Sequence, residues 1–592
     1  MKREEIAQEY KWRMEDLYPD TEAWETEYQK VTDCIAQIKG FEGRLADSAD
    51  MLLKMQETYD DISLMVERLH VYANQRLHEN TANAFYQGLV GRVQVLEVQL
   101  MEATAYIEPE ILSIPEERLT EMLRSKSLTK YNTYFSRMFR KKAHILSKEM
   151  EEVLAGVGEV AEGASDIFMM FNNADIKFPM ITDENGEQVE ITHGKYGSLI
   201  ESKDRKVREA AFKGLYDSYA KFRNTMAAMY RANVKQETFF AKTRRYPSSL
   251  AAALDRSAIP VSVYDNLIET VHSFLPALHK YISVRKQKLG VDELHMYDLY
   301  VPLIGDVDKK IPYEEAQQIV LEGLKPLGED YQALLKEGFS NGWIDVYENE
   351  GKRSGAYSWG AYGTHPYVLL NYQDNLNNVF TLAHEMGHAL HSYHSDAAQD
   401  FIYAGYKIFV AEVASTCNEA LLIHHMLEHS KDDAEKAYLL NHFLEQFRTT
   451  LFRQTMFAEF EKITHAKAEA GEILTADVLC EIYYDLNKRY FGDDIVVDKE
   501  IALEWARIPH FYTPFYVYQY ATGFSAAIAI SSKILAGEPG IVDKYKQFLS
   551  GGSSLDCIEL LKICDVDMTE KKPVEEALKV FEQNLEIFAA MQ

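Results

Sequence analysis

Four histidines and one glutamate fall within eleven residues of the segment TLAHEMGHALHSYHSD, residues 381–396. If this segment is helical, His384 and His388 lie one turn apart on one face, where both imidazoles can reach one ion. Zinc takes nitrogen ligands at about 2.0–2.1 Å in a tetrahedral shell. Glu385, next to the first histidine, then lies where its carboxylate can take a proton from a water held by the metal. The pattern HEMGH therefore predicts a metal site with hydrolytic chemistry.

Apolar residues surround this motif, with FTLA before it and AL after it, so the helix is expected to be buried. Buried histidines and a buried glutamate are costly without partners. Burial therefore favours a metal-binding helix over a chance match to the pattern on a surface helix. The presence of Glu385 also argues against a non-catalytic metal-binding or peptide-binding scaffold, because zinc binding alone does not require this residue.

Neither of the two later histidines suits the third ligand position. His391 lies two turns after His384, about 10 Å along the helix axis, which is too far for one coordination shell. His394 would complete the metzincin pattern H-E-x-x-H-x-x-G-x-x-H, but that pattern needs a glycine where this chain has His391. We therefore interpret both histidines as residues that orient a ligand, face the substrate or pack.

The third ligand is expected from another segment. Residues 406–427, YKIFVAEVASTCNEALLIHHML, are an apolar helical run that contains Glu412 and Glu419. Glu412 follows His388 by 24 residues, an interval that a loop and an antiparallel return helix can occupy. Because unpaired buried glutamates are very rare, Glu412 is our predicted third ligand. Glu419 either orients a ligand histidine or is a carboxylate on the helix surface.

The histidine helix follows a loop and a strand. Gly355, Gly360 and Gly363 interrupt any helix in the segment SGAYSWGAYGTHPYVLLNYQDN, residues 354–375. Within it, PYVLLNY (residues 366–372) has the composition of a strand. This order predicts a strand next to the metal-binding helix.

The composition of the whole chain indicates a globular, mainly helical protein. It has 592 residues, of which 47% are hydrophobic and 26% charged, and only 15 are proline. Apolar residues recur at helical spacing over residues 51–107 and 434–469. The formal net charge of −29 argues against nucleic acid or an anionic membrane as the main partner, because phosphate neutralisation needs clustered Lys and Arg.

One short β-hairpin is predicted within the helical pattern. The segment DENGE, residues 183–187, lies between two β-prone runs, so a turn is expected at Asn185–Gly186. We use this hairpin as the boundary between an N-terminal helical region, residues 1–195, and a catalytic region, residues 196–592.

The two ends of the chain and its cysteines favour a cytoplasmic protein. The first twenty residues, MKREEIAQEYKWRMEDLYPD, lack the apolar core of a signal peptide. The most apolar stretch, ATGFSAAIAISSKILAG, contains Lys533 and is shorter than the roughly 20 apolar residues of a membrane span. Five scattered cysteines favour reduced thiols over a disulfide framework. They are Cys34, Cys417, Cys480, Cys557 and Cys564.

Taken together, these motifs resemble the M3 (thimet oligopeptidase) family of metallopeptidases, and in particular oligoendopeptidase F, its bacterial cytoplasmic branch. The resemblance covers HEMGH and the glutamate in FVAEVAST, and extends through most of the chain. The further segments that carry it are YKWRMEDLYPDTEAW, SGAYSWGAYGTHPYVLLNY and IPHFYTPFYVYQYATG.

The resemblance implies a fold and an activity. The fold would be mainly α, a large two-lobed metallopeptidase with a deep channel and a small β-sheet next to the zinc helix. The activity would be zinc-dependent hydrolysis of internal bonds in short oligopeptides, with one Zn²⁺ per chain. Short peptides would be the partners, because a folded protein could not enter the channel.

The resemblance also implies roles for the segment HFYTPFYVYQY. His510, Tyr516 and Tyr520 would help to stabilise the oxyanion of the tetrahedral intermediate. The alignment of this segment can slide by one residue, and a third tyrosine of the family falls on Gly523 in this chain, which leaves open which tyrosine takes the role. Without the resemblance, the same segment is interpreted as an aromatic core cluster.

We expect the strand before the zinc helix to bind substrate. If PYVLLNY is an edge strand, Tyr367 and Val368 pair with the main chain of a peptide, which explains weak side-chain specificity. Gly360 and Gly363 would let a loop close over the substrate. The alternative for both glycines is an ordinary role in turns.

Two other peptidase classes compete with this interpretation. A helical peptidyl-dipeptidase of the angiotensin-converting type shares HEMGH and the interval to its glutamate, but it needs a cation for the substrate C-terminus. An aminopeptidase of the gluzincin type usually carries G-x-M-E-N, which this chain lacks. The positions at which one peptide is cut distinguish the three classes.

Overall fold

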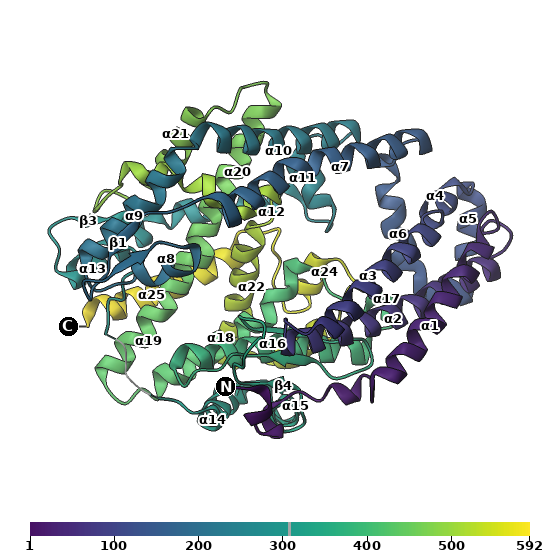
Figure 1. Ribbon diagram of the computed structural model, residues 1–592, viewed down its shortest axis with the longest axis horizontal. Coiled ribbons are helices and arrows are strands. Elements are labelled where there is room, and N and C mark those ends of the chain that lie inside the picture. The colour runs from purple at the N-terminus through teal and green to yellow at the C-terminus, as the bar shows by residue number, and fades with distance from the viewer. Residues whose placement is uncertain (306–309, 592) are drawn as a thin grey trace. The chain divides into compact units, whose positions relative to one another are not determined.

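Apolar residues at helical spacing fold most of the chain into helices, as the pattern predicts (Figure 1). The computed structural model describes residues 1–305 and 310–591. The apolar stretch 51–107 forms two long helices, α2 (Ala49–Glu79) and α3 (Ala84–Thr104). The chain breaks between them because the Asn83 side chain caps the new helix by accepting its first backbone N–H groups.

The predicted helical stretch 434–469 is also confirmed. It contains α19 (Asp433–Gln446) and α20 (Arg453–Glu469), joined without a loop by the wide helical turn η10 (Phe447–Phe452). The mainly helical fold class is therefore correct.

Two compact units make up the chain, each from three segments. Unit 1 contains Met1–Ile145, Lys309–His425 and Ile530–Asp565. Its helices are α1 (Thr21–Ile38), α2, α3, α4 (Ile107–Ser113), α5 (Glu116–Leu123), α6 (Asn132–Lys141), α14 (Tyr313–Gly323), α15 (Glu329–Ser340), α16 (Leu376–Ala398), α17 (Phe401–Ala404), most of α18 (Ile408–Glu428), α23 (Ile541–Leu549) and α24 (Cys557–Lys562).

Unit 2 contains Leu146–Asp308, Met426–Ala529 and Val566–Gln592. Its helices are α7 (Lys148–Met170), α8 (His193–Ile200), α9 (Arg205–Ala220), α10 (Arg223–Thr243), α11 (Ser249–Asp255), α12 (Val261–Ser273), α13 (Leu275–Leu289), α19, α20, α21 (Ala476–Phe491), the first part of α22 (Tyr518–Leu535) and α25 (Lys572–Ala590). The division of the sequence after residue 195 stays a prediction.

Two of the small sheets are two-stranded and belong to unit 2. β1 (Met180–Thr182) pairs antiparallel with β2 (Gln188–Glu190). Gly186 between them has a φ of +84°, as a tight turn requires, so the predicted hairpin is confirmed. β3 (Leu294–His295) pairs parallel with β7 (Ile495–Val496).

The third sheet lies next to α16 in unit 1. Its order is β4-β6-β5, with β4 (Ile344–Asp345) parallel and β5 (Tyr357–Trp359) antiparallel to the central strand β6 (Tyr367–Leu369). Helix α16 packs against β5 and β6. The expected small sheet beside the zinc helix is therefore confirmed.

The prediction that PYVLLNY is an edge strand is wrong. Tyr367 and Val368 lie in the central strand and are fully buried. Two-residue β4 is too short to leave a strand pattern in the sequence, so the second neighbour of β6 could not be recognised. The outer strands on its two sides are β4 and β5.

The N-terminal segment is bound to this sheet by main-chain hydrogen bonds. Arg13 N–H donates to the Gly342 carbonyl at 2.7 Å, and Val346 N–H donates to the Tyr10 carbonyl at 3.0 Å. The start of the chain thereby holds both ends of β4.

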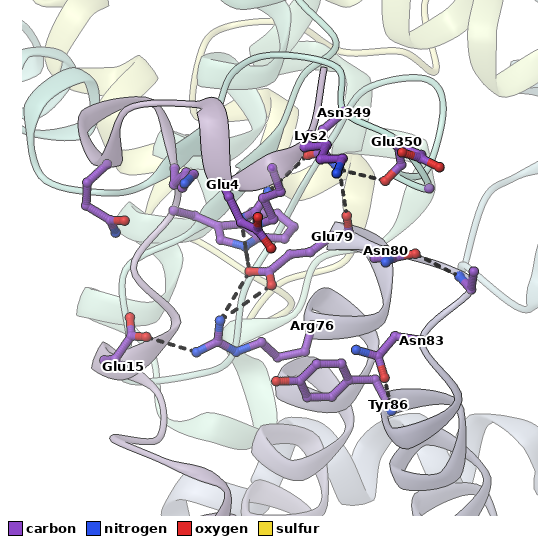
Figure 2. A pocket seen from close by; sticks show the side chains of 16 residues that line it. Lys2, Glu4, Glu15, Arg76, Glu79, Asn80, Asn83, Tyr86, Asn349 and Glu350 are labelled. Carbon is purple, nitrogen blue, oxygen red and sulfur yellow. Dashed lines mark hydrogen bonds and ion pairs between the residues drawn. The ribbon is translucent and has the colours of Figure 1, made fainter.

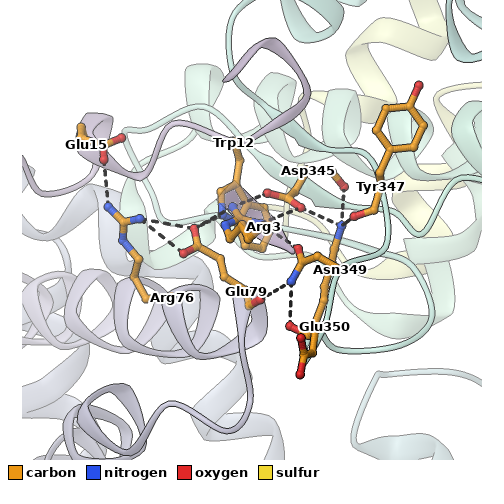
Figure 3. A network of polar contacts seen from close by, with 10 residues as sticks. Arg3, Trp12, Glu15, Arg76, Glu79, Asp345, Tyr347, Asn349 and Glu350 are labelled. Atoms are coloured by element: carbon orange, nitrogen blue, oxygen red, sulfur yellow. Dashed lines mark hydrogen bonds and ion pairs between the residues drawn. The ribbon is translucent and has the colours of Figure 1, made fainter. Parts of the chain in front are cut away.

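A buried ionic network reinforces this attachment (Figure 3). The Asp345 carboxylate, 1% exposed, accepts from Arg3 at 2.5 Å and pairs with the fully buried Lys352 at 2.7 Å. Glu79 at the end of α2 pairs with Arg3 at 3.1 Å and with Arg76 at 3.4 Å. These contacts join the N-terminal segment, α2 and β4.

A cavity of about 750 Å³ lies beside this network (Figure 2). Lys2 and Glu15 from the N-terminal segment, Asn80 and Tyr86 from the junction of α2 and α3, and Glu350 after β4 line it. Its lining contains both acidic and basic groups, and Arg76 is bonded to Glu15 and Glu79.

No helix in the described parts of the chain combines the length and the apolar composition that crossing a membrane requires. The deep channel and the arrangement of two lobes stay predictions.

Candidate metal centre and active site

Helix α16 carries the HEMGH motif. It begins where the Asn375 side chain accepts the Asn378 N–H at 3.0 Å, and its apolar residues form a buried face. His384 and His388 lie between this face and solvent, with side chains 28% and 17% exposed. Both imidazoles can therefore be reached by a substrate while their helix is fixed in the core.

Helix α18 brings Glu412 to the two histidines. The Nε2 atoms of His384 and His388 are 3.2 Å apart. Glu412 Oε2 lies 3.4 Å from Nε2 of His384 and 3.6 Å from Nε2 of His388. The structure thus brings together the three residues that the sequence predicts as metal ligands.

These distances fit a zinc ion. Ligand atoms at about 2.0–2.1 Å from a tetrahedral metal are about 3.3–3.4 Å from one another, and the observed separations surround this value. Within residues 1–305 and 310–591, no other group of three or more His, Cys, Asp or Glu side chains has such geometry. Nitrogen and carboxylate donors are ordinary zinc ligands.

Two further side chains orient the ligand atoms. His384 Nδ1 lies 2.5 Å from Glu419 Oε1, so it donates to this carboxylate and leaves Nε2 as an electron-pair donor toward the metal position. The Ser415 hydroxyl lies 3.2 Å from Glu412 Oε2 and holds that carboxylate from one turn along α18. The structure therefore favours the orienting role of Glu419 over a surface position.

The charges of the cluster are complementary. Burial alone would lower the pKa of His384, but the carboxylates of Glu412 and Glu419 outweigh it and raise that pKa well above its ordinary value. Burial would raise the pKa of Glu412, yet hydrogen bonds from His384 and His388 lower it. The histidines and glutamates of the cluster thus stabilise one another's charged forms, and binding of a metal ion there displaces the proton from Nε2 of His384.

Gly387, the glycine of HEMGH, sets the distance between α16 and α18. A Cβ at this position would lie 2.6 Å from Ser415 Cα and 2.8 Å from the Ala414 carbonyl oxygen. The Asn418 amide of α18 also donates to the Ala383 carbonyl of α16 at 3.0 Å. The close approach of two backbones therefore depends on this glycine.

Glu385 points its carboxylate into a buried environment. The residue is 7% exposed, and in the described part of the chain its Oε2 atom has no hydrogen-bond partner. Burial raises the pKa of this carboxyl group, so it holds a proton more readily than an ordinary glutamate. A buried, unpaired carboxyl next to a metal ligand is suited to accept and return a proton.

His391 and His394 pack against aromatic rings. The His391 ring stacks on Tyr406 with centroids 3.7 Å apart, and burial lowers the pKa of His391 to about 3. The His394 ring stacks on Tyr331 at 6.4 Å. Of the roles left open by the sequence, packing is the one that these contacts support.

His510, Tyr516 and Tyr520 form one cluster in unit 2. His510 lies in the short helix η12 (Pro509–Tyr512), and its ring is 5.9 Å from Tyr516 and 6.0 Å from Tyr520 between centroids. The Tyr520 hydroxyl is 3.5 Å from His510 Nε2. Burial and the charge of Arg453 lower the pKa of His510, which favours the neutral imidazole.

The predicted substrate-binding glycines lie in the turn between β5 and β6. Gly363 has a φ of +82°, which favours glycine, and a Cβ at Gly360 would lie 3.2 Å from Pro366 Cα. Their geometry is that of a tight turn. Closure of this loop over a substrate stays a prediction.

The sequence did not identify Ser415 and Gly387. Ser415 was recognisable only as a hydroxyl one turn after the predicted ligand Glu412. Gly387 occupies a variable position of H-E-x-x-H, and its role depends on the neighbouring helix, which the motif does not describe.

Comparison with known proteins agrees with this site. The model of peptidase family M3 matches residues 198–580, and the model named oligopeptidase F matches residues 110–178. Oligopeptidase PepF of Bacillus subtilis is 49% identical over 99% of this chain and 87% of its own length. An oligoendopeptidase F homologue of Lactococcus lactis is 42% identical over 98% of this chain and 97% of its own.

Solved structures share the fold. Oligoendopeptidase-F from Enterococcus faecium is 39% identical with a TM-score of 0.76, over 96% of this chain and 98% of its own. A chain from Chlamydophila abortus is 34% identical with a TM-score of 0.94, over all of both chains.

Fold and site together define a helical metallopeptidase of the H-E-x-x-H class. The chain belongs to peptidase family M3, and its similarity to the Bacillus subtilis and Lactococcus lactis relatives covers 98–99% of this chain and 87–97% of theirs.

Proposed function

We propose that this chain hydrolyses internal bonds of short oligopeptides with one zinc ion held by His384, His388 and Glu412. The observation that carries the proposal is the tetrahedral spacing of these ligand atoms beside a buried Glu385. The oligoendopeptidase names of the relatives support peptides as the substrate class.

Bound at this cluster, zinc would supply a Lewis acid that polarises a carbonyl and lowers the pKa of a water molecule toward about 7. Glu385 takes the proton of the attacking water and returns it to the leaving amine. Such general acid–base catalysis contributes about 10²–10⁴-fold in rate. Glu419 keeps His384 in the tautomer that binds metal.

His510 and Tyr516 are proposed to donate hydrogen bonds to the oxyanion, as the family resemblance implies, with Tyr520 beside them. Their mutual contacts support a joint role. One such donor is worth about 2.7–4 kcal/mol in the transition state.

The outer edge of β5 is proposed to bind the peptide main chain. Val368 N–H bonds to the Trp343 carbonyl on the β4 side, so its partner Ser358 turns its own N–H and C=O away from the sheet. A cavity of about 310 Å³ follows this edge, lined by Arg353, Ser354 and the strand. Pairing through the main chain requires no particular side chain.

Mass-spectrometric mapping of cleavage tests the function. One peptide is offered with both ends blocked and with both ends free, to zinc-loaded enzyme and to enzyme stripped with a chelator. We expect internal cuts in both peptides by the zinc-loaded enzyme only. Stepwise release of C-terminal dipeptides from the free peptide, with the blocked one intact, would instead show a peptidyl-dipeptidase.

The cytoplasmic location, the absence of nucleic-acid and membrane partners, and the division into regions 1–195 and 196–592 stay predictions from the sequence.

A further inference from the structure

The segment that carries His510 and Tyr516 contains an unusual backbone conformation. Phe515 has a φ of +56°, in the left-handed region, although it is a bulky residue and 3% exposed. This region is unfavourable for residues other than glycine because their Cβ atom crowds the carbonyl oxygen. Such a conformation persists only where the surroundings hold it, and it often marks a functional segment.

A buried carboxyl group holds this turn. Glu461 of α20 is fully buried, and its Oε1 accepts the Phe515 N–H at 2.9 Å. Its Oε2 has no hydrogen-bond partner among the described residues. A fully buried glutamate without a cation is rare, and packing alone does not require one.

The groups around Glu461 come from three helices. Tyr264 of α12 and His465 of α20 enclose the Phe515 ring, with centroid distances of 5.9 and 4.5 Å. Tyr230 of α10 and Tyr264 both have their pKa raised well above the ordinary value, first by burial and then by the charge of Glu461. Burial lowers the pKa of His465 to about 4. The titratable groups facing Glu461 are therefore neutral near pH 7.

Glu461 itself is neutral under the same conditions. Burial raises its pKa to about 8, and the Phe515 N–H offsets only part of this rise. A protonated carboxyl group keeps a carbonyl oxygen that accepts the Phe515 N–H, at a far smaller desolvation cost than a carboxylate.

We propose that Glu461 is a positioning residue, which fixes the left-handed turn at Phe515 and thereby sets the positions of Tyr516 and His510. Tyr516 shares a peptide bond with Phe515, and its ring packs on His510. A change at Phe515 therefore moves both proposed oxyanion donors. This inference rests on the roles of Tyr516 and His510 in the proposed function.

The inference gives a direction for pH dependence. Because the folded-state pKa is raised, Glu461 is protonated below about pH 8 and ionises above it. Ionised Glu461 requires hydration, which its buried position does not provide. We therefore expect the turn at Phe515 to be released above this pH and kcat to fall. KM changes little, because the donors act on the transition state.

Full-length, zinc-loaded Glu461→Gln and Glu461→Ala test this inference with a blocked, quenched peptide between pH 6 and 10. We expect Glu461→Ala to lower kcat about 10–100-fold with little change in KM, since small misplacements of catalytic groups have effects of this size. Glu461→Gln keeps a neutral acceptor, so it should recover most of that loss at pH 7. In Glu461→Gln, the midpoint of the decline of kcat at alkaline pH should lie at least one pH unit higher than in wild type.

Glu459→Gln is the matched control on the same helix. Glu459 is also buried, but it is bonded to His272 and Tyr490, and among the described residues no hydrogen bond joins it to the Phe515 turn. This variant should keep the wild-type midpoint of the alkaline decline.

Two results would overturn the inference: an alkaline decline in Glu461→Gln that matches wild type, or full kcat in a folded Glu461→Ala. If Glu461→Ala does not fold, the pH profile of Glu461→Gln decides. Hydrogen exchange of residues 513–520 separates this inference from the proposed function. Faster exchange of these residues in Glu461→Ala would support the claim that Glu461 fixes the turn at Phe515. Unchanged kcat in Tyr516→Phe would contradict only the proposed role of Tyr516 as an oxyanion donor.

Discussion

At the scale of single residues, the metal centre depends on partners that orient each ligand atom. Glu419 fixes the tautomer of His384, and Ser415 holds the carboxylate of Glu412. Glu385 differs because its Oε2 has no partner in the described residues, which leaves it free to move a proton. The ligand atoms must be held by partners, whereas the base must keep an oxygen without one. Helices α16 and α18 meet both requirements within a few residues.

Replacing Glu419 tests the orienting role. Glu419→Gln keeps the shape but loses the charge that holds the His384 N–H, so we expect zinc affinity to fall about 10–100-fold. Competition for zinc with a chelator measures this affinity. Glu428→Gln, at the far end of α18, is the control and should bind zinc as wild type does. Equal affinity in both variants would contradict the orienting role of Glu419.

At the scale of elements, the site is a contact between two helices. The ligands come from α16 and α18, and Gly387 lets the backbones approach until their ligand atoms are about one tetrahedral edge apart. The sheet β4-β6-β5 packs on α16, and its outer strand β5 carries the edge that we propose binds a peptide.

A methyl group at Gly387 should separate the two helices. Because the nearest atoms are backbone atoms of Ser415 and Ala414, Gly387→Ala is expected to lose about 1–3 kcal/mol of stability and to bind zinc more weakly. Denaturant unfolding and zinc titration measure these effects. Gly91→Ala in α3 is the control, since a Cβ there meets no described atom within 4 Å. Similar results for the two variants would contradict the close-contact role.

Residues of the site can be predicted from the sequence where their role depends on a local pattern, and not where it depends on contacts with distant segments. Helical periodicity alone predicts that His384 and His388 share one face. Glu412 could be predicted as a ligand because it lies in an apolar run, where a carboxylate without a partner is very rare. The strand order could not, because β4 is two residues long and joins the sheet from a distant segment. The left-handed Phe515 and the contact at Gly387 depend on neighbouring helices and leave no local pattern.

At the scale of the whole molecule, distant segments of the chain support the sheet that packs on α16. In unit 1 the N-terminal segment binds β4 through main-chain bonds and through the pair of Arg3 with Asp345. Lys352, which follows β4, completes this pairing from within the core. The first residues of the chain are therefore part of the support for β4, the strand beside the central strand β6.

Lys352→Met tests this support. Removing one partner of a buried ion pair leaves Asp345 partly unpaired, so we expect unit 1 to lose about 3–5 kcal/mol of stability. Lys325→Met is the control because Lys325 is 63% exposed in its pair with Glu322, and such pairs contribute about 0–1 kcal/mol. Thermal unfolding compares the two. A loss no larger than that of the control would contradict the role of this network.

The most direct test of the account is turnover of a blocked peptide by Glu385→Gln that holds a full complement of zinc. We predict zinc affinity close to wild type, because Glu385 is not a ligand, and a kcat lower by about 10²–10⁴-fold. Internal cleavage by wild type together with this loss would establish a zinc endopeptidase in which Glu385 moves the proton. Wild-type turnover by the zinc-loaded variant would contradict it.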